Sequence, residues 1–553
     1  MNQVGLPKRH EGHDKTNLHN SHYANLQYGN KVFYAMLVYL VVVLLVKKIY
    51  YYNVINKCLK KHYKLKKFVV EFVQLNPLLH IVIIGAIALL EGFFDFKITK
   101  MSVYFKKMAR LSYVLTITNL FLVIPRSNFF IFMSYLDSIK LHVWLSTLIL
   151  ILAIVHSILF IVKWTIQGVL FSKIFKLQNF IGLTIFVKIV VLLVLSLTSY
   201  RRRNYQNFYA IHQIAMFSFV VMTILHSDPQ VITPFGFINI TFLLIMIVNK
   251  IINNVSSNDD SFTIDEVKEY GVLKTVNFKN TKVNSMIDYF LSDDVFAAKM
   301  IPGSHIRLHE SSIISLDFWL KPSHPFTLVN NKQLIIKNNE FSRFTSYSMK
   351  KLRDLSLVGI YHPNQEIYNL IDNLNSSGKK NMVTLVAGGS GISFVLSILT
   401  YIMKLNLNDK VFVYWSIKNI YDALIITDFL NDYELNNINF ELALRINVSQ
   451  FVDSPEMLER KSETETVISK LQAKDNIDIS IDYNNRLEMV SIVDNHKQSA
   501  DIQNGETLAH WNVCCGPSLM IDGCRQAVEA YNESISLSSP GSIVEFISEE
   551  YQF

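Results

Sequence analysis

The chain has 553 residues, and half of them are apolar, with a positive mean hydropathy. This length allows two or three domains, and this composition is unusual for a soluble protein, so part of the chain is expected to lie in a membrane. The net charge of +8 does not indicate a nucleic-acid partner, because eight lysines are concentrated in residues 47–67. The four cysteines are too few and too unevenly placed for a disulfide framework, and suggest a reducing compartment for the second half.

Membrane segments are predicted in the first half of the chain and not in the second. A helix needs roughly 20 mostly apolar residues to cross the hydrocarbon core. The tail 1–31 is polar and lacks the apolar core of a signal peptide, so the first membrane helix is expected to act as an uncleaved insertion signal. About seven candidate segments follow, near residues 32–46, 77–94, 103–124, 141–162, 180–198, 206–226 and 233–250.

Charge patterning predicts the orientation of these segments. The eight lysines of 47–67 and the arginines of 201–203 would lie in the cytosol under the positive-inside rule, which places the C-terminal half in the cytosol as well. The five basic residues of 95–110 oppose this assignment, because that loop would lie outside. We expect a multi-pass protein of the plasma membrane or the endoplasmic reticulum. Two charges within the membrane segments, Glu91 and Lys188, have no role that the sequence assigns.

Two of the apolar segments each carry a pair of histidines fourteen residues apart, His142 with His156 and His212 with His226. Fourteen residues of helix are about 3.9 turns and about 21 Å of rise, so each pair lies on nearly one face, near opposite leaflets. If the two helices run in the same direction, His142 faces His212 and His156 faces His226. Each level then offers two imidazoles, the axial ligand set of a six-coordinate haem iron.

Other interpretations of these histidines are weaker. A single membrane histidine is more often part of an interhelical hydrogen bond, but here four residues agree in spacing. A zinc or copper site would need its ligands within a few ångströms of one metal, and the rise of about 21 Å separates the two levels. The spacing therefore predicts two stacked b-type haems, with haem iron as the resident metal.

The residues around the histidines, LHVWLSTL and YQNFYAIHQ, and the preceding IPRSNFF resemble the ferric reductase and NADPH oxidase superfamily. The resemblance extends from about residue 100 to the C-terminus. It implies electron transfer across the membrane between two helices that hold two haems. Because haems pass single electrons, a hydride donor needs a flavin between it and them, so the second half is expected to bind FAD and a nicotinamide dinucleotide.

The flavin site is predicted after two stretches that alternate like strands of a small antiparallel barrel, YGVLKTVNF and HIRLHESSIISLDFWL. Directly afterwards, His324, Pro325, Phe326 and Thr327 match the family's flavin signature, although HPFT alone is also typical of a turn entering a strand. Two positions depart from the family pattern: Asn330 replaces a small hydroxyl residue, and GIYH at 359–362 replaces the Gly-Pro-Tyr-Gly turn that helps place the diphosphate. FAD use is expected, whereas its orientation is less defined.

The nucleotide site is predicted where NMVTLVAGGSGISFVLSILTYIM reads as a buried strand, a glycine turn and a helix, the arrangement that cradles a pyrophosphate. The turn lacks the G-x-G-x-x-G spacing but resembles the G-G-x-G-[IV]-[TS] of the reductase family, with Phe394 in place of the family's following proline. The residues that carry this match are Gly388, Gly389, Ser390, Gly391, Ile392 and Ser393.

Three further elements complete the predicted nucleotide site. Lys418, after the next strand, stands where the family has a basic residue that binds the 2′-phosphate of NADPH, but a solvated lysine at a strand end is an equal alternative. Residues 515–517, Cys515, Gly516 and Pro517, match the Cys-Gly-Pro that lies against the nicotinamide, whereas Cys514 is expected to pack. The terminal Phe553 resembles the aromatic that covers the flavin, and a frayed end is its alternative.

We therefore predict a multi-pass α-helical membrane domain of about seven helices, followed by a ferredoxin-reductase-like module with an antiparallel β-barrel and an α/β nucleotide domain. The lipid bilayer is one partner, and a small acceptor is the other. The overall organisation resembles small yeast metalloreductase-type members of the superfamily, which implies a chelated ferric or cupric ion as the acceptor, with dioxygen reduced to superoxide as the alternative. The predicted boundaries are 1–31 for the tail, 32–250 for the haem domain, 260–372 for the FAD domain and 380–553 for the NADPH domain, which holds a polar, partly disordered insertion near 452–485.

Overall fold

The structure is a computed structural model of the whole chain, and it divides the chain into two compact units. Met1–Ile124 and Asp137–Ile247 form the first, and Pro125–Leu136 and Val248–Phe553 form the second. The residues that the structure describes are 21–51, 63–94, 101–124, 135–227, 229–252, 254–256, 262–280, 301–309, 313–330, 332–337, 356–361, 363, 365–375, 381–405, 410–432, 440–451, 454–472, 477–493, 509–535 and 544–549.

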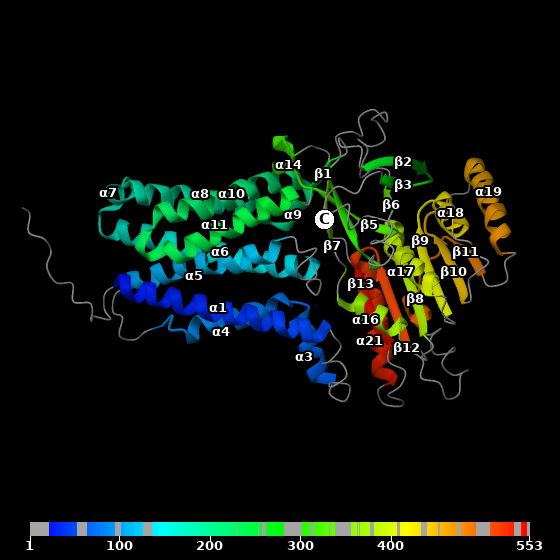
Figure 1. Ribbon diagram of the computed structural model, residues 1–553, viewed down its shortest axis with the longest axis horizontal. Helices are drawn as coiled ribbons and strands as arrows, with labels where there is room; N and C mark the ends of the chain where they lie inside the picture. The colour runs from blue at the N-terminus through cyan, green and yellow to red at the C-terminus, as the bar shows by residue number, and fades with distance from the viewer. Residues whose placement is uncertain are drawn as a thin grey trace, which may run out of the picture. The chain divides into compact units, whose positions relative to one another are not determined.

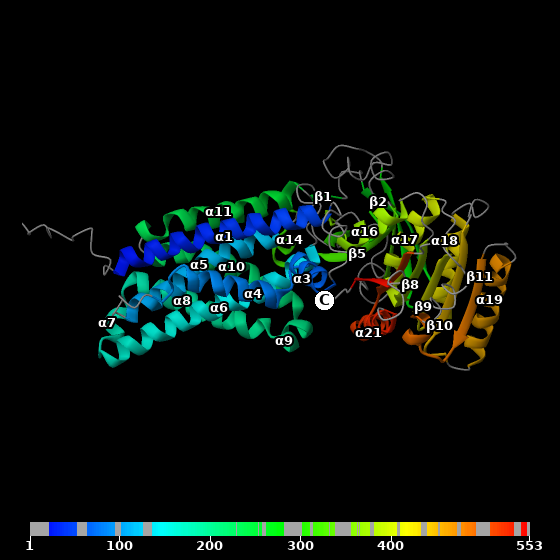
Figure 2. The ribbon, with the colours of Figure 1, turned by 90° about the horizontal axis from the view of Figure 1, so that it is seen from below.

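The first unit is a bundle of long helices that run side by side (Figures 1 and 2), joined by the short helices α3, α7 and α9. Its last long helix, α11, continues a few residues into the second unit. The helices are α1 (Ser21–Tyr51), α3 (Tyr63–Val73), α4 (Pro77–Leu90), α5 (Met101–Val123), α6 (Tyr135–Ile166), α7 (Leu170–Ile174), α8 (Leu177–Ser196), α9 (Thr198–Arg203), α10 (Tyr205–His226) and α11 (Pro229–Ile252).

A helix occurs at each of the seven predicted membrane segments. The predicted α-helical membrane domain is thus confirmed. Among the described residues, five helices are long and apolar enough to cross a bilayer, namely α1, α6, α8, α10 and α11. The other two differ for physical reasons. Helix α4 has 14 residues, and so rises only about 21 Å. Helix α5 carries Lys106, Lys107 and Arg110 and is lined by protein, because every residue from Arg110 to Leu120 is buried.

Helix α1 begins at Ser21, eleven residues before the predicted apolar segment and within the predicted tail. The reason is packing, since Asn25 and Tyr28 are buried although this part of the helix is polar. Gly29 leaves room for the side chain of Arg110 on α5, because a Cβ at Gly29 would lie 2.7 Å from the Arg110 Cδ. The helix is therefore longer than hydropathy alone indicates.

The second unit contains a seven-stranded sheet in which every pairing is antiparallel, in the order β1-β7-β4-β5-β6-β3-β2. Helices α14 (Leu316–Leu320) and α16 (Gln365–Leu374) accompany it. This sheet is the predicted antiparallel β-domain. Its strands are β1 (Asn254–Ser256), β2 (Phe262–Glu269), β3 (Leu273–Asn280), β4 (His305–His309), β5 (His324–Asn330), β6 (Gln333–Lys337) and β7 (Ser356–Tyr361).

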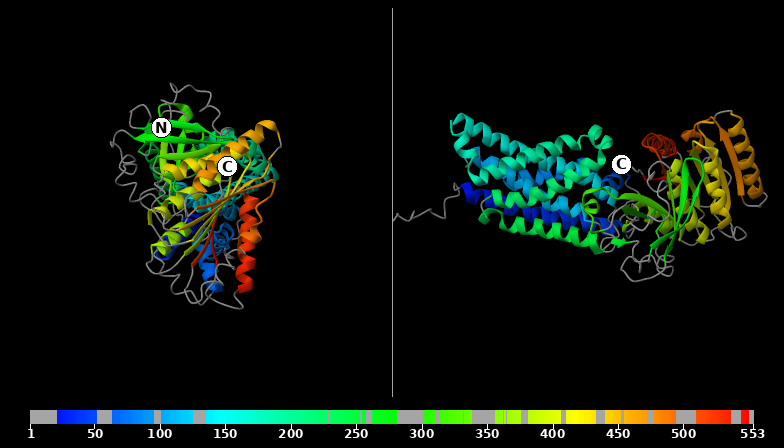
Figure 3. Two further views of the ribbon diagram at one scale, coloured as in Figure 1. Left: turned by 90° about the vertical axis from the view of Figure 1, so that its right-hand side faces the viewer. Right: turned by 90° about the horizontal axis from the view of Figure 1, so that it is seen from above.

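The rest of the second unit is a six-stranded parallel sheet, in the order β11-β10-β9-β8-β12-β13, with helices on both faces (Figure 3). The predicted α/β fold is thus confirmed. Its elements are β8 (Asn381–Gly388), the short 3-10 helix η3 (Gly389–Gly391), α17 (Ile392–Leu405), β9 (Lys410–Ile417), the 3-10 helix η4 (Ile420–Ala423), α18 (Leu424–Asp432), β10 (Glu441–Val448), α19 (Pro455–Gln472), β11 (Ile477–Tyr483), β12 (Ala509–Cys515), α21 (Ser518–Ile535) and β13 (Val544–Glu549).

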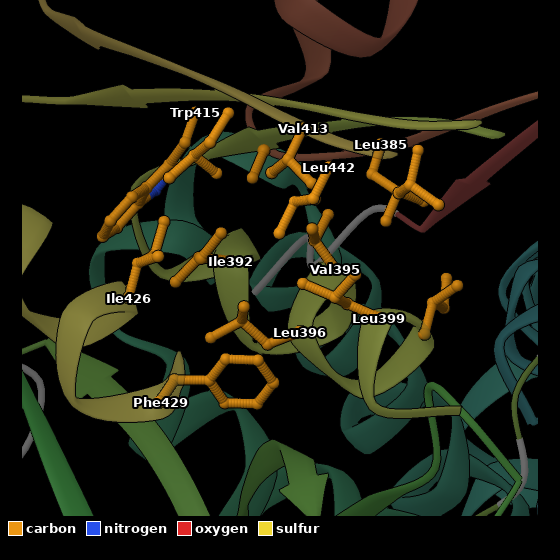
Figure 4. Packing of buried hydrophobic residues seen from close by; sticks show 14 of the residues in the cluster. Leu385, Ile392, Val395, Leu396, Leu399, Val413, Trp415, Ile426, Phe429 and Leu442 are labelled. Atoms are coloured by element: carbon orange, nitrogen blue, oxygen red, sulfur yellow. The ribbon is translucent and has the colours of Figure 1, made fainter. Parts of the chain in front are cut away.

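Successive side chains of the buried strands point to opposite faces and fill two cores. On one face, Leu385, Val413 and Trp415 meet helices α17 and α18, which Figure 4 shows at close range. On the other face, Val386 and Cys514 meet α21. The expectation that Cys514 packs is therefore correct, and Cys515, which follows it, points to the opposite side of the sheet.

The segment near 452–485, predicted as a polar, partly disordered insertion, forms regular structure in its described residues. Helix α19 and strand β11 fill most of that range, and β11 pairs in parallel with β10 at the edge of the sheet. Only one stripe of the helix is buried, through Ile468 and Leu471, and β11 buries Ile477 and Ile479 against the same core. A mostly exposed helix and an edge strand need few apolar residues, so the segment resembles an unfolded one in composition.

A buried carboxylate joins the two sheets of the second unit. Asp422 Oδ1 accepts hydrogen bonds from the backbone N–H groups of Gly271, Val272 and Leu273, at 3.1, 2.8 and 2.9 Å. Burial raises the pKa of the Asp422 carboxyl, and the three N–H groups oppose this by stabilising the charged form. The turn between β2 and β3 is thereby fixed to η4.

We predict that Asp422→Ala destabilises the chain by about 2 to 3 kcal/mol, because three buried N–H groups lose a charged acceptor. Urea unfolding of the detergent-solubilised chain, followed by tryptophan fluorescence, measures this change. Asp428→Ala is the matched control, because Asp428 accepts from the Tyr270 hydroxyl at 2.9 Å but is 42% exposed. Equal losses in the two variants would contradict a special role for the Asp422 contact.

Candidate functional site

His142 on α6 and His212 on α10 lie close together. We call them the inner pair, because the predicted orientation places them toward the cytosol, and we call His156 and His226 the outer pair. The ring centres of His142 and His212 are 6.1 Å apart, and the ring planes are nearly perpendicular, at 85°. Two imidazoles that share one metal through bonds of about 2 Å place their ring centres roughly 6 Å apart. The spacing of this pair therefore fits two axial ligands on one iron. Asn119 on α5 donates to the Ser146 hydroxyl at 2.8 Å, and that hydroxyl lies 3.4 Å from His142 Nε2.

The outer pair is held by backbone carbonyl groups. His156 Nδ1 donates to the carbonyl of Phe105 on α5 at 2.8 Å, and His226 Nδ1 donates to the carbonyl of Gln178 on α8 at 2.7 Å. A carbonyl can only accept, so each of these Nδ1 atoms carries a proton in this contact. The lone pair of Nε2 stays free for a metal, as is usual for metal-binding histidines.

The helix directions agree with the two predicted levels. The His142 ring meets the His212 ring, and farther along both helices the Ser112 and Tyr113 hydroxyls of α5 donate to the Ile149 carbonyl of α6 and the Val220 carbonyl of α10. Helices α6 and α10 therefore run in the same direction. Helix α5 runs antiparallel to α6, because the Ser112 hydroxyl donates to the Ile149 carbonyl between the contacts at Phe105 and Asn119. Sequence reasoning missed α5 as the helix that positions both levels, because its charged and hydroxyl side chains lower its hydropathy.

A further buried membrane histidine, His80 on α4, differs from the four. The Tyr39 hydroxyl contacts its Nδ1, and its Nε2 lies 2.9 Å from the Phe72 carbonyl. Both ring nitrogens are thus engaged within the protein, which leaves no lone pair for a metal. Among the described residues, no group of three or more histidine, cysteine, aspartate or glutamate side chains converges to hold a metal ion. The pair of His142 and His212 offers two imidazoles, a donor set that fits a cofactor-held iron.

Glu91 and Lys188 occupy different surroundings. Glu91 is the C-cap residue of α4, so it stands at the end of the helix rather than within it. The Lys188 ammonium on α8 donates to the Ser218 hydroxyl of α10 at 3.1 Å and lies 3.6 Å from the Met222 sulfur. Both partners lie between His212 and His226 along α10, so this contact holds α8 against the helix of the two ligands.

The predicted flavin residues lie on β5. Thr327 stands opposite His305 of β4, and Pro325 stands opposite Arg307. Phe326 and Thr327 are buried, whereas His324 and Pro325 are partly open. Two signals near this strand were missed by sequence reasoning. The His305 ring stacks on Tyr361 with centres 5.1 Å apart, and the Arg307 guanidinium donates to the hydroxyl and the carbonyl of Ser323, at 2.8 Å each.

The two departures near the flavin strand have different outcomes. Asn330 ends β5, and its side-chain oxygen accepts from the Lys332 N–H at 2.9 Å, so it caps the turn to β6. Of the GIYH segment, Gly359, Ile360 and Tyr361 end strand β7, while His362 lies outside the described residues. The predicted flavin-covering Phe553 also lies outside them.

The glycine turn and the Cys-Gly-Pro turn meet at one point of the parallel sheet. They follow β8 and β12, which are neighbours although the chain order changes direction there, and such a switch point is where open α/β sheets bind ligands. A Cβ at Gly391 would lie 2.9 Å from the Cys515 carbonyl carbon, and one at Gly516 would lie 3.2 Å from the Gly388 nitrogen. Side chains at these glycines would fill the crevice that a dinucleotide backbone needs.

Neighbouring side chains fix the glycine turn. The Trp415 indole N–H donates to the Gly389 carbonyl at 2.9 Å, and Gly389 has a φ of +54° that favours glycine. The Ser393 hydroxyl donates to the Ser390 carbonyl at 3.0 Å, at the start of α17. Ile392 is buried in the core below. Trp415 was missed as a support of this site, although it lies only two residues before Ile417, the end of β9.

Phe394 has a structural reason to replace the family's proline. Its ring packs against Gly303 before β4, where a Cβ would lie 2.5 Å from the ring, and Gly303 has a φ of +80°. The Gly303 N–H donates to the Ser397 hydroxyl of α17 at 2.8 Å. Helix α17 also packs on β5. Phe394 therefore packs the helix of the glycine turn against the residues that precede β4.

Cys515 and Lys418 lie at the same edge of the sheet. Cys515 is fully buried, and burial together with the charge of Glu549 raises the pKa of its thiol well above the ordinary value. The thiol therefore stays protonated near neutral pH and presents a packing surface rather than a nucleophile. Lys418 directly follows the carboxyl end of β9 and is exposed. Pro517 closes the Cys-Gly-Pro turn, 2.8 Å from a Cβ built at Gly388.

Comparison with known proteins places the chain in a family. Residues 108–223 match the ferric reductase like transmembrane component, and residues 380–529 match the ferric reductase NAD binding domain. A probable metalloreductase, AIM14 of Saccharomyces cerevisiae strain YJM789, is 30% identical over 471 residues, which cover 81% of this chain and 76% of that protein. The chain belongs to the ferric reductase-like family. It is a membrane oxidoreductase with a nicotinamide dinucleotide domain.

Other members of the ferric reductase-like family match over more of their length. The probable metalloreductase AIM14 of Kluyveromyces lactis is 27% identical over 535 residues, or 92% of this chain and 96% of that protein. The Scheffersomyces stipitis protein of the same name is 25% identical over 571 residues, or 99% and 98%. A solved flavohemoglobin from Malassezia yamatoensis covers 82% of this chain and 97% of that chain at 10% identity, with a TM-score of 0.35, which is too low to assign a fold.

The outer histidine level of this reductase can be tested through Gly182 on α8. A Cβ there would lie 2.5 Å from the His226 ring, whose Nδ1 is already fixed by the Gln178 carbonyl. We predict that Gly182→Ala displaces the ring and lowers the haem content by about half, measured as the pyridine haemochrome of the purified chain. Gly85→Ala on α4 is the matched control, because its Cβ would meet nothing within 4 Å. Wild-type haem content in Gly182→Ala would contradict the assignment.

Proposed function

We propose that the chain carries electrons from cytosolic NADPH through FAD and two b-type haems to a metal ion on the opposite side of the membrane. The observation that carries the proposal is the two-level arrangement of His142 with His212 and His156 with His226. Its support comes from the ring spacing of the inner pair and from the carbonyl contacts of the outer pair. The metalloreductase names of the relatives favour a chelated ferric or cupric ion as the acceptor.

The nucleotide domain would bind NADPH across the switch point. The backbone N–H groups after β8 and the start of α17 would hold the pyrophosphate, since helix N-termini attract anions. Gly391 and Gly516 keep side chains out of that path, and the protonated Cys515 would pack against the nicotinamide. Lys418, after the next strand, would bind the 2′-phosphate as a point charge.

The antiparallel domain would hold FAD along β5, where the Thr327 hydroxyl is buried and His324 is partly open. Helix α17 packs on this strand, so a nicotinamide at the glycine turn would reach a flavin at the HPFT tetrad without a large movement. When bound, the flavin would accept a hydride and release electrons singly, and the haem irons would relay them. The four histidines would bind the two haem irons, and none of them would have to transfer a proton.

The sidedness of the proposal depends on charge. Eight lysines in residues 47–67 and the arginines of 201–203 favour a cytosolic position for the ends of the helices that carry His142 and His212. His156 and His226 would then be near the outer leaflet. The inner pair would hold the haem on the flavin side, and the outer pair would hold the haem on the acceptor side. The membrane would be the plasma membrane or the endoplasmic reticulum.

The cofactor preference tests the role of Lys418. We predict that Lys418→Ala raises KM for NADPH roughly tenfold to a hundredfold and leaves KM for NADH nearly unchanged, because one charged hydrogen bond is worth about 1.5 to 3 kcal/mol. Lys410→Ala is the matched control, since Lys410 begins the same strand and pairs with Glu441 at 3.1 Å. Equal losses for both nucleotides would assign Lys418 to the fold, and no loss would leave it a solvated lysine.

The identity of the acceptor is tested with purified protein, NADPH and ferric chelate under air. We predict that ferrous product forms at the same rate with and without superoxide dismutase and persists when oxygen is removed, because the outer level reduces the metal directly. Product that disappears with superoxide dismutase or without oxygen would identify dioxygen as the acceptor. That result would make the chain a superoxide-generating oxidase and overturn the metal assignment.

A further inference from the structure

Two apolar side chains at the start of helix α14 are largely exposed. Ile314 is 93% exposed and Leu316 is 70% exposed, and Ile314 is the most exposed of the large apolar side chains that the structure describes. Single exposed apolar residues are common on protein surfaces, but two such residues separated by one position form a small apolar tip. They lie outside the membrane helices, in the antiparallel domain.

The backbone of this tip is fixed by its own hydrogen bonds. Ser315 caps α14, because its hydroxyl accepts from the Asp317 N–H at 3.2 Å. The Trp319 indole N–H donates to the Ile313 carbonyl at 3.0 Å, and Phe318 is fully buried. With the buried side of the helix held in this way, Ile314 and Leu316 stay on the outside. The Asp317 carboxylate is paired with Lys321 at 2.7 Å, which reduces the charge beside the tip.

The tip is connected to the end of a membrane helix. Lys250, in the last turn of α11, donates from Nζ to the Phe318 carbonyl at 2.7 Å. The same ammonium lies 4.5 Å from the centre of the Phe318 ring and 5.1 Å from that of Trp319. All of these residues belong to the second compact unit. The contact therefore ties α14 to the place where the chain leaves α11.

The end of α11 marks the face of the bilayer. The apolar span of this helix runs from Pro234 to Ile251, and Val248 and Ile251 near its end are 50% and 45% exposed, as side chains that meet lipid would be. Lysine and tryptophan are the residues that membrane proteins place at the level of the lipid headgroups. Lys250 and Trp319 provide this pair, and the exposed tip stands beside them.

We propose that Ile314 and Leu316 insert into the interfacial region of the bilayer at the cytosolic end of α11, with Trp319 and Lys250 at headgroup level. The partner is the lipid surface, which the exposed Val248 and Ile251 side chains at the end of α11 would also meet. The contact would hold the domain that carries the HPFT tetrad at the membrane face. It requires no haem, so the inference stands apart from the assignment of the histidines.

Site-directed spin labelling of the full chain in lipid nanodiscs tests this proposal. Cys514, Cys515 and Cys524 are buried, so a Cys58→Ser background is suitable for labels introduced at Ile314→Cys or Leu316→Cys. Power saturation compares collisions with oxygen, which concentrates in lipid, and with a nickel chelate, which stays in water. Leu519→Cys on α21 is the matched control, because Leu519 is 86% exposed and isolated, and Val248→Cys provides the lipid reference.

The expected result is an oxygen-to-nickel accessibility ratio at residues 314 and 316 at least several-fold above that at residue 519 and closer to that at residue 248. A ratio at both positions equal to that of residue 519 would overturn the proposal, because the tip would then lie in water. Low accessibility to both reagents would also overturn it, since the tip would then be covered by protein. Flavin and haem occupancy, measured on each labelled variant, reports that the chain is folded.

Discussion

The membrane unit depends on the pairing of imidazole nitrogens with backbone carbonyls. The bilayer core holds no water to satisfy a polar group, so each histidine needs its partners within the protein. His156 and His226 use Nδ1 in this way, through the carbonyls of Phe105 and Gln178, and keep Nε2 for a metal. His80 uses both of its nitrogens and keeps neither. The ring nitrogens that are paired within the protein therefore distinguish His156 and His226 from His80.

Close packing also constrains the two turns of the predicted nucleotide site. The glycine turn and the Cys-Gly-Pro turn approach so closely at the switch point that a side chain at Gly391 would overlap the backbone of Cys515. The same close packing continues into the antiparallel domain through Phe394 and Gly303. Asp422 also joins the two domains, because it accepts hydrogen bonds from three backbone N–H groups of the antiparallel domain. The two turns are thus packed closely against each other and against buried neighbours.

Spacing and short motifs predicted much of this organisation. The paired histidines of α6 and α10, the strand of the HPFT tetrad and the glycine turn after β8 lie in the elements that the sequence indicates. Helix α5 was underrated because it is surrounded by protein and needs no lipid-facing surface. Helix α19 and β11 were missed because an edge position buries few side chains. The support from Trp415 depends on a contact between distant strands, which no local pattern reveals.

The central claim is that electrons cross the membrane through the two histidine levels. The most direct measurement uses proteoliposomes that contain the purified chain and an impermeant ferric chelate trapped inside, with NADPH added outside. For molecules whose nucleotide domain faces outward, the account predicts reduction of the trapped chelate. Reduction of chelate added outside, while the trapped chelate stays oxidised, would contradict the account, because the electrons would then leave on the side where they entered.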